Sequence, residues 1–136
     1  MPKAVGIDYG TKSVGIAISD PSQIIATALC TTPNKDVFKF LIDLLQKENI
    51  NTIVVGEAKN LDGTDTDSTS EILTFVQKLK ILFPKVKVTT IDERFTSKIA
   101  FQSIIDSGIK RKKRQNKSLI DEVSATIILQ DYLTYN

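Results

Sequence analysis

Acidic residues stand at the ends of several apolar segments of this sequence. Asp8 ends the first segment, Glu57 ends NTIVVGE, and Asp92 and Glu93 follow VKVTTI. Asp121 lies in a later segment whose apolar residues recur at helical spacing. Burying an unpaired carboxylate costs on the order of several kcal/mol, so buried acids that converge usually hold a cation. Oxygen ligands suit Mg²⁺ or Mn²⁺, and two such ions can stabilise the attacking and the leaving oxygen in phosphodiester cleavage.

The sequence contains no histidine. Nucleophiles activated by histidine, zinc sites built on histidine and acid–base steps through histidine are therefore excluded. The single cysteine, Cys30, excludes a disulfide framework. Any catalysis must use carboxylates, lysines, hydroxyls or metal ions, which agrees with a metal site built from acids.

Each acidic group also has a purely structural interpretation. Asp121 follows Ser118 by three positions, the spacing of a helix capping box. The triplet from Asp92 to Arg94 could form a surface ion pair at a strand end. Asp8 is harder to explain in this way, because apolar segments flank it on both sides. The joint placement of the acids favours the metal-site interpretation.

Positive charge is concentrated in one short run between residues 110 and 117. The formal net charge of the chain is +2, so outside the +6 of this run the remainder carries −4. Such a run can neutralise phosphates of a nucleic acid, and a solvated loop without a partner is the alternative. The run leads directly into the segment of Asp121, so phosphates bound there would lie near the proposed metal ions. Its basic residues are Lys110, Arg111, Lys112, Lys113, Arg114 and Lys117.

Apolar patterning predicts five strands, at residues 4–9, 13–19, 23–32, 51–57 and 86–91. The first three are separated only by tight turns, which predicts an antiparallel meander. Helical spacing predicts helices from about residue 36, from 68 to just before Pro84, from about 97 to 107 and from 119 to 132. The second helix has a predicted buried stripe of Ile72, Phe75, Val76, Leu79 and Leu82.

This order of elements predicts an α/β fold in which a mixed five-stranded sheet carries helices on both faces. Ligand sites in such sheets form at the carboxyl ends of the strands, where the acids described above are placed. In the last helix, Asp121 is in line with Ala125, Ile128 and Tyr132, so its side chain is predicted to face the protein.

The length of 136 residues suits one compact domain, so residues 1–136 are predicted to form a single domain. Hydrophobic residues make up 41% and charged residues 25%, as is usual for globular proteins. No apolar run approaches the roughly 18 residues that span a bilayer, and the amino terminus lacks the zones of a signal peptide. We therefore expect a cytoplasmic protein without a membrane partner.

Four blocks of the sequence together resemble the YqgF family, also called RuvX. They are DYGTKSVGIAISD, VGEAKNLDGT, DERFTS and NKSLIDEVSATIILQDYL, and they extend over essentially the whole chain. The resemblance implies a ribonuclease H-like fold and a metal-dependent nuclease that trims the 5′ end of precursor 16S rRNA. Some members of this family are proposed as Holliday junction resolvases.

Carried over by position, the resemblance implies that Asp8, Glu93 and Asp121 are the catalytic acids, with Asp92 as an additional candidate ligand. Lys12 and Arg94 match further positions of the family pattern.

Lys12 and Arg94 would both suit phosphate contacts. One departure from the family pattern concerns the end of the fourth strand. The family usually has Val-Gly-Leu-Pro there, whereas this chain has VGEAKN. Glu57 therefore stands where the related RuvC-like resolvases have a catalytic glutamate. It is either a further metal ligand or an exposed loop residue.

The resulting hypothesis is a nuclease in which Asp8, Glu93 and Asp121 coordinate one or two Mg²⁺ or Mn²⁺ ions. Structured RNA would be recognised through phosphates and shape, since no aromatic stacking platform is evident. Two alternatives remain. The same chemistry could act on a DNA four-way junction, which would favour a homodimer over a monomer. The chain could also be a ribosome-assembly factor that binds RNA without cleaving it.

Overall fold

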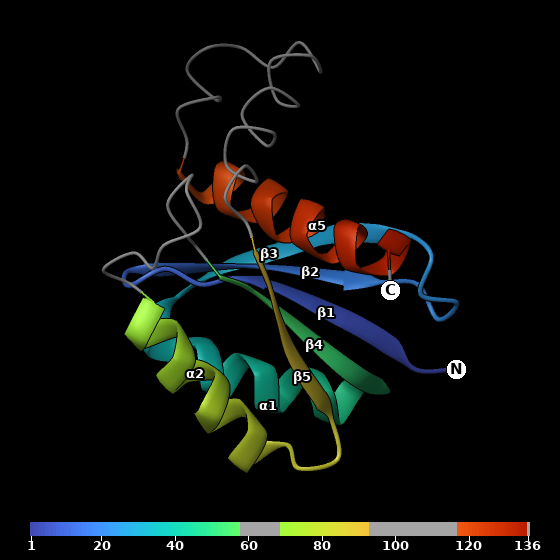
Figure 1. Cartoon of the computed structure of the whole chain (residues 1–136), viewed down its shortest axis with the longest axis horizontal. Coiled ribbons are helices and arrows are strands. Elements are labelled where there is room, and N and C mark those ends of the chain that lie inside the picture. The colour runs from blue at the N-terminus through green and yellow to red at the C-terminus, as the bar shows by residue number, and fades with distance from the viewer. Residues whose placement is uncertain (58–68, 93–116, 136) are drawn as a thin grey trace, which may run out of the picture.

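A five-stranded sheet forms the centre of the computed structural model, which describes residues 1–57, 69–92 and 117–135 (Figure 1). The strand order is β3-β2-β1-β4-β5. The first three strands are antiparallel neighbours, whereas β4 is parallel to β1 and β5 is parallel to β4. The predicted meander and mixed sheet are thus confirmed. The strands are β1 (Lys3–Asp8), β2 (Ser13–Ser19), β3 (Ala26–Pro33), β4 (Ile50–Glu57) and β5 (Lys87–Asp92).

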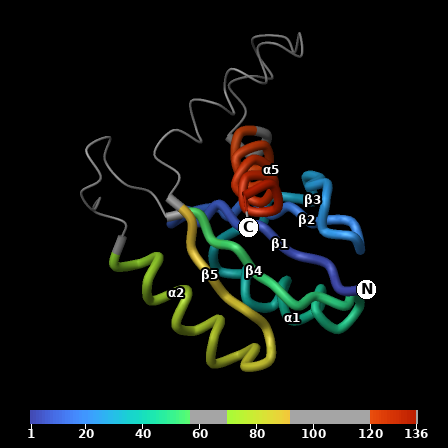
Figure 2. Tube along the Cα trace, turned by 45° about the vertical axis from the view of Figure 1, so that its right-hand side comes forward, coloured from blue at the N-terminus to red at the C-terminus, as the bar shows by residue number. Residues whose placement is uncertain are grey.

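Helices cover both faces of the sheet, as predicted. Helices α1 (Val37–Lys47) and α2 (Thr69–Leu82) pack on one face, and α5 (Lys117–Tyr135) packs on the other (Figure 2). A short 3-10 turn, η1 (Asn34–Asp36), precedes α1. The helix predicted at 97–107 lies outside the described residues. Within the described ranges, no helix has the length and apolar character needed to cross a membrane.

The two faces of the sheet differ in the size of their side chains. The face toward α1 and α2 is lined by large aliphatic residues, among them Ile7, Ile16 and Ile53. Opposite α5 the sheet presents smaller ones, including Ala4 and Ala17. Small side chains let a helix backbone approach a sheet closely, so α5 lies nearer to the strands than bulky residues would allow.

The structure corrects the predicted start of two elements and the predicted burial of one side chain. Strand β3 begins at Ala26, not at residue 23, and Ile24 and Ile25 are 64% and 60% exposed. They form part of a turn because the Asp20 carboxylate accepts hydrogen bonds from both of their N–H groups. Leu82, predicted to be buried, is 45% exposed because it lies in the last turn of α2. The final helix begins at Lys117, two residues earlier than predicted.

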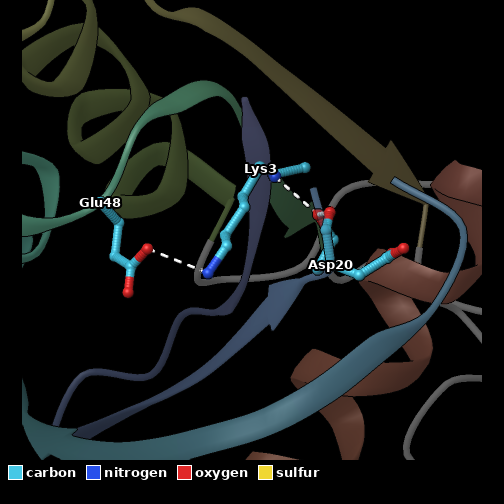
Figure 3. Close-up of polar contacts among 5 residues, drawn as sticks. Lys3, Asp20 and Glu48 are labelled. Carbon is cyan, nitrogen blue, oxygen red and sulfur yellow. Dashed lines mark hydrogen bonds and ion pairs between the residues drawn. The ribbon is translucent and has the colours of Figure 1, made fainter. Parts of the chain in front are cut away.

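The start of β1 is tied to the chain between α1 and β4. The Lys3 N–H donates to the Asn49 carbonyl at 2.7 Å, and the Lys3 ammonium lies 2.9 Å from the Glu48 carboxylate. Figure 3 shows the Lys3 side chain pointing toward Glu48, with Asp20 to the other side of β1. Because both partners of the ion pair are partly exposed, it contributes at most about 1 kcal/mol.

The turn at Asp20 predicts a pH-dependent contribution to stability. Hydrogen bonds from the N–H groups of Ile25 and Ile24 hold the pKa of the Asp20 carboxyl below its usual value. A lowered folded-state pKa stabilises the fold above the unfolded-state pKa, and this contribution is lost as the pH falls through the folded-state pKa. Asp20→Asn should therefore destabilise the protein most near neutral pH, and the difference from wild type should shrink below about pH 4. Urea unfolding of both proteins from neutral pH to below about pH 4 measures the difference in their free energies of unfolding. A difference independent of pH would contradict the prediction.

Candidate active site

Three predicted acidic positions lie at one edge of the sheet. Strands β1, β4 and β5 are parallel and adjacent, so their carboxyl ends meet there. Asp8 is in register with Gly56, and the next residue along, Glu57, is in register with Asp92. The convergence of these backbone positions agrees with the prediction. Glu93, Arg94 and the basic residues from 110 to 114 lie outside the described residues, and the side chains of Glu57 and Asp92 are likewise not described.

Asp121 lies at the same edge of the sheet, on helix α5, which packs on one of its faces. Its side chain is 2% exposed, on the stripe of α5 that also buries Ala125 and Ile128. The predicted inward orientation of Asp121 is therefore confirmed. Its backbone lies against Gly15 of β2, so closely that a Cβ atom at Gly15 would collide with the Asp121 carbonyl. Gly15 is also the partner of Asp8 in the β1–β2 ladder, so Asp8 and Asp121 share one neighbour.

A hydroxyl group contacts the buried acid directly. Ser13, the first residue of β2, donates a hydrogen bond from its Oγ to Asp121 Oδ2 at 2.8 Å. The two residues are 108 positions apart in the sequence, so only the fold brings them together. The sequence motif around Asp8 contained Ser13, but nothing in its spacing pointed to a contact with Asp121.

The turn that carries Lys12 lies beside the acids. Residues Gly10, Thr11, Lys12 and Ser13 line a hollow of about 220 Å³, and Lys12 is exposed. Asn34 braces this turn, since its side-chain amide donates to the Gly10 carbonyl at 2.7 Å and its N–H donates to the Lys12 carbonyl at 2.9 Å. An exposed ammonium on a braced turn suits a phosphate contact. Sequence reasoning missed Asn34 because its partners lie more than 20 positions earlier.

The described helices begin at this edge. Val37 of α1 and Ser70 of α2 line one hollow of about 270 Å³ together with Tyr9, which directly follows Asp8. Helix α5 begins one turn before Asp121, which lies against Gly15. The amino ends of helices carry partial positive charge and free N–H groups, so this edge favours anionic ligands such as phosphates.

The donor atoms at the edge fit a hard divalent cation. Asp8 and Asp121 supply carboxylate oxygens, which is the ligand chemistry that Mg²⁺ and Mn²⁺ prefer. Among the residues that the structure describes, no cluster of three or more acidic, histidine or cysteine ligands is assembled. Of the other predicted ligands, Glu93 lies outside the described residues, and the side chains of Glu57 and Asp92 are not described.

Solved structures of similar shape identify the class of fold. RuvC from Thermus thermophilus, in a complex with a Holliday junction substrate, superposes with a TM-score of 0.55 over 98% of this chain and 94% of that chain. A second structure of the same protein gives the same TM-score. The sequence identities are 14% and 13%, so this likeness concerns the fold. The predicted ribonuclease H-like fold is confirmed.

Sequence comparisons then identify the family. The chain belongs to the RuvX family, whose model, described as "RuvX: Holliday junction resolvase", matches residues 2–135. A relative from Flavobacterium psychrophilum is 52% identical over 98% of both chains and is named "Putative pre-16S rRNA nuclease". A relative of the same name from Flavobacterium johnsoniae is 50% identical over 98% of this chain and 97% of its own length. The resemblance seen in the four sequence blocks is confirmed.

The close contact at Gly15 predicts a large effect of a single methyl group. Gly15→Ala places a Cβ against the Asp121 carbonyl, so α5 must move away from β2. Overpacking against backbone is expected to lower the free energy of unfolding by at least about 2 kcal/mol, as measured by urea denaturation. Thr27→Ala, at an exposed position of β3, serves as the control and should change stability by about 0.5 kcal/mol or less. Equal stability of the two variants would contradict the predicted role of Gly15.

Proposed function

We propose that this protein is a metal-dependent nuclease that processes the 5′ end of pre-16S rRNA during ribosome biogenesis in the cytoplasm. Residues 1–136 would form its single catalytic domain. The observation that carries the proposal is that Asp8, at a strand end, and the buried Asp121 both lie next to Gly15. The names of the RuvX relatives support pre-16S rRNA as the substrate.

In this proposal Asp8, Glu93 and Asp121 hold one or two Mg²⁺ or Mn²⁺ ions, with Glu57 and Asp92 as further candidate ligands. When bound, such ions supply Lewis-acid stabilisation of the negative charge that develops on phosphate oxygens. The acids would hold the ions at a fixed place, because Asp8 belongs to a central strand and Asp121 to a helix packed on the sheet.

Basic residues would hold the substrate backbone beside the acids. Lys12 lies on the braced turn next to Ser13, where its ammonium would contact a phosphate. Arg94 offers a planar guanidinium for a bidentate phosphate contact, and the run from 110 to 117 adds charge close to the start of α5. Contacts of this kind read backbone position and RNA shape more than base identity.

A second candidate substrate is a DNA four-way junction. The description of the RuvX family model as a Holliday junction resolvase favours it. The catalytic residues would be the same, and a junction would call for a homodimer that cuts two strands symmetrically.

Replacing Asp8 by Asn should abolish metal-dependent cleavage while leaving the fold intact. The change keeps the size of the side chain but removes the charge that would bind the cation, so a loss of at least about 100-fold in cleavage rate is expected. The measurement uses end-labelled RNA with a precursor 16S leader beside a DNA four-way junction, each with Mg²⁺, Mn²⁺ or EDTA.

Asp43→Asn is the matched control, because Asp43 is an exposed acid of α1 and lies outside the candidate site. It should cleave like wild type. Retained cleavage by the Asp8→Asn variant would overturn the proposed role of Asp8. Preferred cutting of the junction would identify the second substrate. Salt-sensitive RNA binding without cleavage, unchanged by the substitution, would favour an assembly factor instead.

The basic run should set the salt dependence of binding. Substituting Lys112, Lys113 and Arg114 by Gln removes half of its charges. If each contacts one phosphate, the negative slope of log affinity against log salt concentration should become less steep by about 2. Fluorescence anisotropy with labelled RNA at several salt concentrations measures the slope. An unchanged slope would show that the run is a solvated segment without a role in binding.

A further inference from the structure

A hydrogen bond joins the side chain of Ser13 to that of Asp121, a predicted catalytic acid. The Ser13 hydroxyl donates to Asp121 Oδ2 at 2.8 Å, and the Asp121 side chain is 2% exposed. We propose that Ser13 is a positioning residue, which orients the Asp121 carboxylate for cation binding. This inference rests on the proposed function, because it assigns Asp121 a ligand role.

The position of the Ser13 hydroxyl is determined by its surroundings. Ser13 is in register with Pro33 of β3, and the neighbouring Asn34 holds the turn before it through the carbonyls of Gly10 and Lys12. A serine side chain has a single rotatable bond before its oxygen, so a fixed backbone leaves the hydroxyl only three staggered positions.

The backbone of Asp121 is restrained from the other side. Its carbonyl lies against Gly15, which fixes the height of α5 above β2 at this point. The carboxylate then keeps only its side-chain rotations. A hydrogen bond to Oδ2 restricts these rotations and leaves Oδ1 with a defined direction. Gly15 and Ser13 are two positions apart on β2. Gly15 therefore restrains the backbone of Asp121, and Ser13 restrains its carboxylate.

The chemistry of a hydroxyl suits this role better than that of a cation. A lysine or arginine at position 13 would hold the carboxylate but would also neutralise it, which would weaken its attraction for a divalent ion. A serine hydroxyl donates a hydrogen bond to the ionised carboxylate and adds no net charge. Removing such an outer partner of a metal ligand typically costs about 10- to 100-fold in metal affinity or activity.

The experiment is a Mn²⁺ titration of the full chain by isothermal calorimetry, without substrate. Ser13→Ala should raise the Kd for Mn²⁺ by about 10-fold or more. Ser13→Thr keeps a hydroxyl on a β-branched residue that strands accept, and it should restore a Kd close to wild type. The Mn²⁺ concentration for half-maximal RNA cleavage should shift in the same way as the Kd.

Ser19→Ala is the matched control, since Ser19 is the other serine of β2 and lies buried at the far end of the strand. Its hydroxyl accepts from the Ala4 N–H at 2.8 Å and donates to the Asp20 carbonyl at 2.9 Å. This variant should lose stability and keep its Kd for Mn²⁺. It therefore separates a general loss of stability from a specific loss of metal affinity.

The outcomes distinguish the inference from the proposed function. Wild-type binding of Mn²⁺ with an unchanged Kd in Ser13→Ala would overturn the inference and leave the proposed function standing. An equal loss of affinity in Ser13→Ala and Ser19→Ala would also overturn the inference, because stability alone would explain it. If wild type bound no Mn²⁺ and cleaved equally in EDTA, the metal-dependent function would fail, and the role of Ser13 with it.

Discussion

The close approach of α5 to the sheet is the constraint on which the candidate site depends. It is possible because two strand positions opposite the helix have no side chain. A Cβ at Gly6 would lie 2.5 Å from Leu129 Cβ and 2.8 Å from the Ala125 carbonyl, and one at Gly15 would collide with Asp121. Close packing of this kind tolerates little added volume. The same contacts that stabilise the helix on the sheet therefore bring Asp121 to the ladder position of Asp8.

The topology then gathers complementary groups at one edge. The three parallel strands end there, and the described helices begin there, so carboxylates and the partial positive charges of helix ends lie near each other. This combination suits a site that binds a cation and a phosphate together, because each partner offsets the charge of the other. Large aliphatic residues on the opposite face hold α1 and α2, so the two layers serve different purposes.

The ribonuclease H-like fold that the chain shares with RuvC does not by itself select a substrate. The candidate site is defined by specific groups on this fold. They are Asp8 of a central strand, the buried Asp121 of α5 and the turn that carries Lys12. Asn34 and Ser13 connect these groups, because one braces the turn and the other contacts the buried acid. The turn and the buried acid are therefore linked, because Ser13 directly follows Lys12 in the chain.

The sequence by itself determined the strands, most of the helices, the mixed sheet and the inward orientation of Asp121. These features follow from local periodicity and from the few ways of connecting such elements, so they are visible without coordinates. Only the tertiary structure decided the exposure of Ile24, the roles of Gly15 and Asn34, and the contact of Ser13 with Asp121. Each of these depends on contacts between residues distant in the sequence or on hydrogen bonds between a side chain and the backbone. Local patterns carry no information about such contacts, because their energies arise only when the chain has folded.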